Sequence, residues 1–237
     1  EARKALERER ELNELKSKFV SIASHEFRTP LSTVLSSASL IDQYNQRDEK
    51  DKVNKHVQRI KSSVNHLTSI LNDLLSLGKL EEGKIDVVME PVPVADFLND
   101  VEEELASTLK TGQRLIVDYK SAPPAVDTDP RILRNILFNL ISNASKYSET
   151  GKPIFVTSIK QGKAVSFIVR DEGIGIPDED QKFMFDRFFR ASNAGNVQGT
   201  GLGLNIVKRY VDLLKGSITF TSEFGKGSIF TVTIPLQ

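Results

Sequence analysis

Residues 131–148 read RILRNILFNLISNASKYS, and this stretch decides the fold of the second half of the chain. Asn139, Asn143 and Lys146 lie four and three residues apart, so they share one face of a helix. Amide oxygens and an ammonium on one face suit a hard cation and phosphate oxygens, although a solvated polar face would carry the same residues. Beside that face runs an apolar stripe at helical spacing, which predicts packing on a core: Leu133, Ile136, Leu137, Leu140, Ile141 and Ala144.

Around this helix, which is expected over 130–147, the sequence alternates between strand and helix periods. Further helices are expected at 94–110 and 202–215. Asp129 before Pro130 fits the N-cap of the helix at 130–147, and Gly216 fits the end of the helix at 202–215. This set of elements predicts an α/β sandwich, in which helices cover one face of a mixed sheet. Alternating apolar residues predict strands at 85–90, 114–120, 153–160, 164–171, 217–222 and 227–234.

The first half of the chain reads as two long helices around a polar turn at residues 45–50. Pro30 should kink the first helix or loosen one of its turns. Two such helices cannot cover both apolar faces alone, so we expect an antiparallel hairpin that forms a dimeric four-helix bundle. The first helix carries Leu12, Leu15, Phe19 and Ile22 in heptad rhythm, and the second carries Val53, Val57, Ile60, Val64, Leu67, Leu71 and Leu74.

Composition limits the functional classes. The 32 basic and 32 acidic side chains balance, so no net charge draws the chain to nucleic acid, and none is expected as a partner. The absence of Cys excludes disulfides and thiolate metal sites and suits a reducing cytoplasm. No apolar run is long enough to cross a bilayer. The chain begins inside a helix pattern, so an upstream sensor module is expected, and the full-length protein is left open as cytoplasmic or membrane-anchored.

Two glycine-containing stretches suggest a nucleotide site. In DEGIGIP, at 171–177, Asp171 continues the inward parity of the preceding strand, so its carboxylate should face a pocket and accept a hydrogen bond from an exocyclic amine. Gly173 and Gly175 would let a flat ligand approach the backbone. GTGLGL, at 199–204, leads into a helix whose N-terminus suits phosphate. Neither a Walker motif nor a GxGxxG dinucleotide fingerprint is present.

With these motifs the chain resembles the protein histidine kinases of two-component systems along nearly its whole length. The resemblance implies an α+β multidomain protein, with a dimerisation and histidine phosphotransfer domain at 1–82, including an N-terminal coiled-coil segment. Residues 83–237 would be a catalytic ATP-binding domain, the sandwich shared with gyrases, Hsp90-type chaperones and MutL proteins. Six motifs stand in family order: SHEFRTP from Ser24, NLISNASKY from Asn139, DEGIGIP from Asp171, FDRFFR from Phe185, GTGLGL from Gly199 and GKGSIF from Gly225.

The resemblance assigns roles in binding ATP and Mg²⁺. Asn143 would ligate Mg²⁺ with Asn139 close by, and Lys146 would contact phosphate. Asp171 would read the adenine amine, and Gly173 and Gly175 would belong to the same nucleotide-binding site. The remaining residues would flank the nucleotide (Tyr147), lie near the terminal phosphates (Arg190), and shape the lid and the phosphate contacts (Gly199, Thr200, Gly201, Leu202 and Gly203).

The resemblance also assigns the reacting residues. His25 would be phosphorylated, and Glu26 would take its ring proton and raise its nucleophilicity. Thr29 lies one turn beyond His25 and could orient a water for hydrolysis of a phosphorylated partner. The phosphoryl group would pass to an aspartate in the receiver domain of a response regulator, and a homodimer would form through residues 1–80. His56 and His66 lack such surroundings and are expected at the surface.

Two other functions fit parts of the pattern. An ATP-driven conformational clamp of the related superfamily would need no phosphorylated histidine, and a scaffold that only dimerises would need no nucleotide site. The cluster of His25, Glu26, Thr29 and Pro30 favours the kinase over the clamp, and the intact Asn143 and glycine motifs favour it over the scaffold. The input signal, the cognate regulator, and cis or trans phosphorylation are left open.

Overall fold

The computed structural model describes residues 2–195 and 197–236, with the side chains of residues 2–20 and 22 left undescribed. The chain forms two compact units. The helical unit comprises Glu1–Gly78 with Gln198–Thr200, and the sheet unit comprises Lys79–Val197 with Gly201–Gln237. Among the described residues, none of the helices is long and apolar enough to span a membrane.

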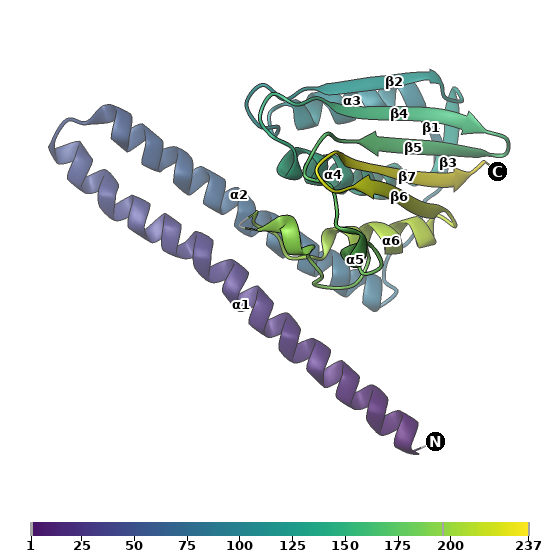
Figure 1. Ribbon diagram of the computed structural model, residues 1–237, viewed down its shortest axis with the longest axis horizontal. Coiled ribbons are helices and arrows are strands. Elements are labelled where there is room, and N and C mark those ends of the chain that lie inside the picture. Colours follow the sequence, from purple (N-terminus) through teal and green to yellow (C-terminus); the bar gives the residue numbers. More distant parts are fainter. Residues whose placement is uncertain (1, 196, 237) are drawn as a thin grey trace. The chain divides into compact units, whose positions relative to one another are not determined.

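Two long helices build the helical unit and confirm the predicted hairpin (Figure 1). Helix α1 spans Ala2–Gln46 and helix α2 spans Lys50–Glu81, so the turn is three residues long. Asp48 adopts a left-handed φ of 56° at that turn, which an Asp tolerates better than most residues. Pro30 is buried within α1, which stays helical on both sides of it.

The buried side chains of α2 lie outside the predicted heptad seam. They are His56, Ile70 and Leu77, whereas Val64 and Leu71 of that seam are about half exposed, at 47% and 49%. The corresponding seam of α1, at Leu12, Leu15, Phe19 and Ile22, lies outside the side chains that the structure describes. The exposed apolar side chains of the described part of the hairpin are Leu31, Leu35, Val64, Leu71 and Leu75.

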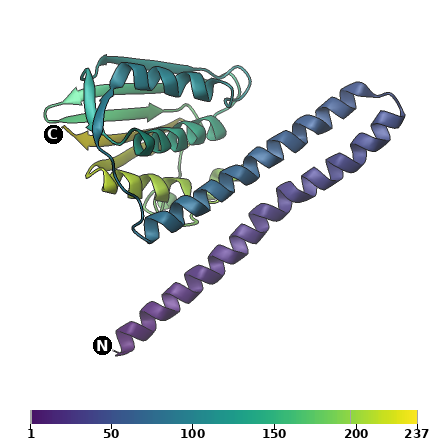
Figure 2. The same ribbon diagram turned by 180° about the vertical axis from the view of Figure 1, so that it is seen from behind.

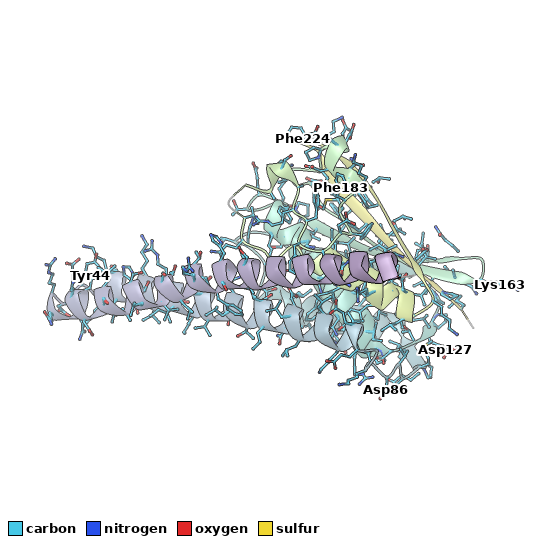
Figure 3. The ribbon with its side chains drawn as sticks, turned by 90° about the horizontal axis from the view of Figure 1, so that it is seen from below. Tyr44, Asp86, Asp127, Lys163, Phe183 and Phe224 are labelled. Atoms are coloured by element: carbon cyan, nitrogen blue, oxygen red, sulfur yellow. The ribbon has the colours of Figure 1, made fainter. Side chains whose placement is uncertain are left out.

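His56 is buried, so the expectation that it lies on the surface is wrong. Only 6% of the residue is exposed, and its Nδ1 lies 3.3 Å from Ser37 Oγ of α1. Its ring stacks on Tyr44, with centroids 5.6 Å apart, near the turn end of the hairpin, where Figure 3 labels Tyr44. A neutral imidazole with a hydroxyl partner can occupy a core position, and a search for aliphatic residues alone misses it.

The sheet unit has a mixed sheet, as predicted, and its five strands lie in the order β2-β4-β5-β7-β6. Strand β2 pairs parallel to β4, and the other neighbours are antiparallel. Helices α3, α4 and α6 cover one face (Figure 2). The strands are β2 (Leu115–Ser121), β4 (Ile154–Gln161), β5 (Ala164–Arg170), β6 (Ser217–Glu223) and β7 (Gly227–Pro235), and the helices are α3 (Val94–Ala106), α4 (Pro130–Tyr147) and α6 (Gly203–Leu213).

Short elements depart from the predicted pattern. No strand forms over 85–89; instead β1 (Glu90–Pro93) pairs with β3 (Ala125–Thr128), which was not predicted. The backbone N–H of Val88 is used elsewhere, because it donates to Asp129 Oδ2 at 2.9 Å. A one-turn helix α5 (Asp178–Gln181) and a 3₁₀ turn η1 (Ser192–Ala194) lie in the segment before α6.

Gly216 follows α6 for a different reason from the one expected. The left-handed residue after the helix is Lys215, with φ 55°, and not Gly216. A Cβ atom at Gly216 would lie 2.4 Å from the carbonyl oxygen of Thr233 in β7. A glycine is therefore needed at this position because the chain passes close to the sheet. It is not needed to supply the left-handed backbone angle of a helix end.

Asp129 fixes the start of α4 as its N-cap, as predicted. Its Oδ1 accepts hydrogen bonds from the N–H groups of Arg131 and Ile132, and its Oδ2 accepts from Val88 N–H and from Arg131 Nη2, at 2.8 Å. Burial raises the pKa of this fully enclosed carboxyl, but the hydrogen bonds from Arg131, Val88 and Ile132 outweigh that effect and leave the pKa below its ordinary value.

Replacing Asp129 by Asn keeps an N-cap acceptor but removes the buried carboxylate oxygen that accepts from Val88 N–H and Arg131 Nη2, so it should lower the free energy of unfolding by about 1–3 kcal/mol at pH 7. Because the pKa of Asp129 is lowered in the folded state, the ionised carboxylate stabilises the fold above about pH 4, and the difference between variant and parent should shrink as the pH falls below that. Urea unfolding followed by tyrosine fluorescence measures it. Asp127→Asn, at an exposed position of β3 (Figure 3), is the matched control and should change little.

Candidate functional site

The start of α6 lies against the polar face of α4. A Cβ atom at Gly203 would lie 3.0 Å from Asn139 Oδ1 and 3.9 Å from Asn143 Nδ2. Asn139 Nδ2 donates to the carbonyl oxygen of Asn135 at 3.0 Å, so its oxygen is the group turned toward Gly203. The two amides, which share one face of α4, therefore lie next to the N-terminus of α6.

This donor set fits Mg²⁺ and phosphate. Amide oxygens are hard ligands, and a Mg²⁺ ion usually keeps several waters and takes few protein ligands beside phosphate oxygens. Among the described residues no group of three or more His, Cys, Asp or Glu side chains can hold a metal. A cation at this site would be held through Asn139 and Asn143, with the N–H groups at the start of α6 facing anionic oxygens.

Asp171 directly follows β5 and is buried, with 7% of the residue exposed. Its Oδ1 accepts hydrogen bonds from the N–H groups of Gly173, at 2.8 Å, and Ser228, at 3.3 Å. Burial raises the pKa of the carboxyl to about 6, although these two hydrogen bonds oppose the shift. No described residue donates to Oδ2, so this oxygen can accept from the amine of a ligand.

Gly173 and Gly175 leave room for the protein's own backbone. A Cβ atom at Gly173 would lie 2.6 Å from the carbonyl oxygen of Tyr147, and one at Gly175, where φ is 61°, would lie 2.0 Å from that of Glu223. Ile174 N–H also donates to Tyr147 O at 3.1 Å. These contacts tie the loop after β5 to the end of α4, so the glycines locate Asp171 beside Tyr147, a role that differs from the expected approach of a flat ligand.

Tyr147 and Arg190 lie beside each other. Burial raises the pKa of the Tyr147 phenol, and the neighbouring Arg190 guanidinium opposes that rise. Arg190 Nη2 donates to the carbonyl oxygens of Gly195, at 3.4 Å, and Val197, whereas its buried Nε has no hydrogen bond among the described residues. The structure thus brings the predicted nucleotide-flanking tyrosine and phosphate-side arginine together.

The glycine-rich segment before α6 is divided between the helical unit and the sheet unit, after Thr200. Gly201, with φ 70°, accepts a 3.0 Å hydrogen bond at its carbonyl oxygen from Phe188 N–H, and Phe188 itself has a left-handed φ of 61°. Leu202 is buried just before α6. Gln198–Thr200 are grouped with the helical unit, where Thr200 Oγ1 donates to Asp73 Oδ2 of α2 at 3.0 Å.

Lys110 and Gln113 support the site and were missed. Lys110 Nζ donates to the carbonyl oxygens of Lys146, at 2.6 Å, and Ser148, at 2.8 Å. Gln113 Nε2 donates to Ser145 O at 3.2 Å and Glu149 O at 3.0 Å. These side chains satisfy carbonyl groups that the end of α4 leaves without helical partners, and thereby hold Lys146 and Tyr147 in place.

The predicted phosphorylation site lies in the helical unit. His25 is a well-exposed side chain of α1, at 75%, and its Nδ1 lies 3.6 Å from Glu26 Oε1. Glu26 is only 14% exposed, and its Oε2 lies 3.9 Å from Nε2 of His66 on α2. The expectation that His66 is a surface residue is therefore wrong. Thr29 Oγ1 lies 3.5 Å from the carbonyl oxygen of His25, at the limit for a hydrogen bond.

Two family models match separate parts of the chain. Residues 15–83 match the His Kinase A (phospho-acceptor) domain, and residues 128–237 match the histidine kinase-, DNA gyrase B- and HSP90-like ATPase. An uncharacterized sensor-like histidine kinase of Rhizobium meliloti is 33% identical over 94% of this chain and 43% of its own length. The chain spans less than half of each of the curated histidine kinases compared with it.

Solved structures show the same fold. The Acinetobacter baumannii histidine kinase AdeS superposes with a TM-score of 0.66 at 24% identity, over 90% of this chain and 98% of AdeS. Full-length ShkA in complex with AMPPNP gives a TM-score of 0.66 at 28% identity, over 93% of this chain and 46% of ShkA. The phospho-acceptor hairpin, the ATPase sandwich and these relatives together show that the chain belongs to the sensor histidine kinases of two-component systems.

Proposed function

We propose that this chain is the ATP- and Mg²⁺-dependent kinase core that phosphorylates His25 and passes the phosphoryl group to an aspartate of a response regulator. The observation that carries the proposal is the exposed His25 ring with a largely enclosed carboxylate, that of Glu26, at 3.6 Å from its Nδ1. An exposed imidazole can meet the terminal phosphate of a bound nucleotide, and the carboxylate is positioned to take the ring proton.

The sheet unit supports adenine and Mg²⁺ binding. Asp171 Oδ2 would accept from the adenine amine, and Tyr147 would flank the base. Asn143 and Asn139 would hold Mg²⁺, which neutralises charge on the phosphate oxygens, while Lys146, Arg190 and the start of α6 face the phosphate chain. The adjacent loop, Gly199, Thr200, Gly201 and Leu202, would form the lid over them.

The helical unit supports a homodimer. Leu31, Leu35, Val64, Leu71 and Leu75 are 47–72% exposed in the single hairpin. A second hairpin packed on these side chains would complete a four-helix bundle, and each apolar side chain buried there contributes about 1–3 kcal/mol. The domains would divide at residues 82 and 83, the helices dimerising and the sandwich catalysing.

The reaction would proceed through Nε2 of His25. Its lone pair attacks the γ-phosphorus, the bond from that phosphorus to the bridging oxygen breaks, and the electron pair leaves on ADP. The Nδ1 proton passes to Glu26. The phosphohistidine then donates its phosphoryl group to the receiver aspartate. In a separate reaction, Thr29 would orient a water that attacks the phosphorylated aspartate of the regulator and releases inorganic phosphate, giving the chain phosphatase activity.

Replacing His25 by Gln should abolish incorporation of labelled phosphate from ATP and leave ATP affinity unchanged, because the nucleophile and the nucleotide site lie in different units. The parent's label should be labile in acid and stable in alkali, as a phosphoramidate is. Undiminished labelling of the variant would show that another residue is the acceptor.

Asp171→Asn should weaken ADP binding by about 1–3 kcal/mol, because the amide puts a donor opposite the adenine amine. The same change should stabilise the nucleotide-free chain. The raised pKa means that the ionised carboxylate is disfavoured in the folded state. Asp171 therefore does not lower the free energy of unfolding below about pH 4, and lowers it by its full amount, on the order of 1–3 kcal/mol, above about pH 6.

Calorimetric titration with ADP and Mg²⁺, and urea unfolding at pH 4 and 7.5, measure the two effects of Asp171→Asn. Glu172→Gln, at an exposed neighbour, is the control for the lost charge. A variant that binds ADP as tightly as the parent would rule out the adenine-reading role.

Thr29→Ala should reduce dephosphorylation of the regulator about tenfold or more while sparing autophosphorylation, because a hydroxyl that orients water has no part in the attack on ATP. The assay uses a regulator that the phosphorylated chain itself labels. Thr33→Ala, one turn further along α1, is the control, since Thr33 Oγ1 donates to Thr29 O at 3.1 Å. A parallel loss of both activities would make Thr29 a structural residue.

A further inference from the structure

Glu26 lies between two imidazole rings that come from different helices. Its Oε1 is 3.6 Å from Nδ1 of His25, the next residue on α1, and its Oε2 is 3.9 Å from Nε2 of His66 on α2. The side chains of Glu26 and His66 are 14% and 15% exposed, whereas that of His25 is 75% exposed. The carboxylate is therefore bracketed, with one oxygen toward the exposed ring and the other toward an enclosed ring.

A carboxylate that accepts a proton from His25 has to keep one oxygen at the Nδ1 side of that ring. A glutamate has several rotamers, and holding it in one of them costs conformational entropy. Both separations are ion-pair distances, longer than hydrogen bonds, and contacts of this kind shorten when the reacting complex forms. A group fixed on the far oxygen reduces the number of orientations available to the carboxylate.

We infer that His66 is a positioning residue for phosphoryl transfer, which holds Glu26 Oε2 so that Oε1 faces Nδ1 of His25; this inference rests on the proposed function. In the transfer step the proton moves from His25 Nδ1 to Glu26 Oε1 as Nε2 bonds to phosphorus and ADP leaves. His66 neither gains nor loses a proton. Its Nε2–H, the tautomer that a carboxylate partner selects, stays directed at Oε2.

The role needs a neutral donor. A full positive charge on His66 would stabilise the carboxylate and weaken Glu26 as a base, whereas a neutral N–H orients the group at a smaller loss of basicity. A glutamine amide supplies a neutral N–H at a similar distance from the backbone, and a leucine supplies none. His66→Gln should therefore retain the function that His66→Leu loses.

The experiment measures kcat and the KM for ATP of autophosphorylation in the full chain. We expect His66→Leu to lower kcat about tenfold with KM within about twofold, a part of what general-base catalysis contributes. His66→Gln should stay within about threefold of the parent. Asn65→Leu places the same new side chain at the adjacent exposed position and should leave both constants unchanged. Equal losses in the Leu and Gln variants would overturn the inference.

A double-mutant cycle separates positioning from a general effect on the bundle. If His66 acts through Glu26, then His66→Leu should cost no further activity in a Glu26→Gln chain. The same tenfold loss in that background would mean that His66 only supports the helices, and the inference fails. If the parent chain labels His25 and the His66 variants are as active as the parent, this inference alone is overturned. If the parent chain incorporates no label, the proposed function is refuted as well.

Discussion

The sheet-unit site depends on helix α4 being held at both of its ends. At the start, the buried Asp129 carboxylate accepts from the first turn and from Val88, and at the finish Lys110 and Gln113 donate to the last carbonyl groups. Between these ends one face of α4 is fully buried, with Leu137 and Ile141 at 0% exposure. The polar face has no freedom to rotate, so Asn139 and Asn143 remain directed at the start of α6.

The same helix locates the buried carboxylate of Asp171. The loop after β5 is tied to Tyr147 O by Ile174 N–H and to Glu223 through the close approach at Gly175. These contacts keep Asp171 buried although burial disfavours its ionised form. The raised pKa of the carboxyl is the consequence of that burial. A buried acceptor with one uncommitted oxygen is suited to select an amine, because a ligand without a donor would leave that oxygen without a partner.

The sequence predicted the elements that carry a regular pattern. The stripe of α4, the alternation that ends in Asp171 and the N-cap at Asp129 are local signals, each readable within one element. Strands β1 and β3 have four residues each, too few for a period, and they pair across more than thirty residues of chain. His56 and His66 face inward because of partners on the other helix, and Lys110 and Gln113 act on distant carbonyl groups; no spacing within their own segments records such contacts.

Phe188 has a left-handed backbone angle, with φ 61°, in the FDRFFR segment. A bulky residue in that region costs about 1–2 kcal/mol relative to an ordinary angle. The hydrogen bond from Phe188 N–H to Gly201 O and the close approach of the two backbones hold it there. Phe188 therefore keeps its strained conformation only while this contact holds, and a rearrangement that separates Phe188 from Gly201 would relieve the strain. Opening the contact between Phe188 and Gly201 therefore costs about 1–2 kcal/mol less than it would if Phe188 had an ordinary backbone angle.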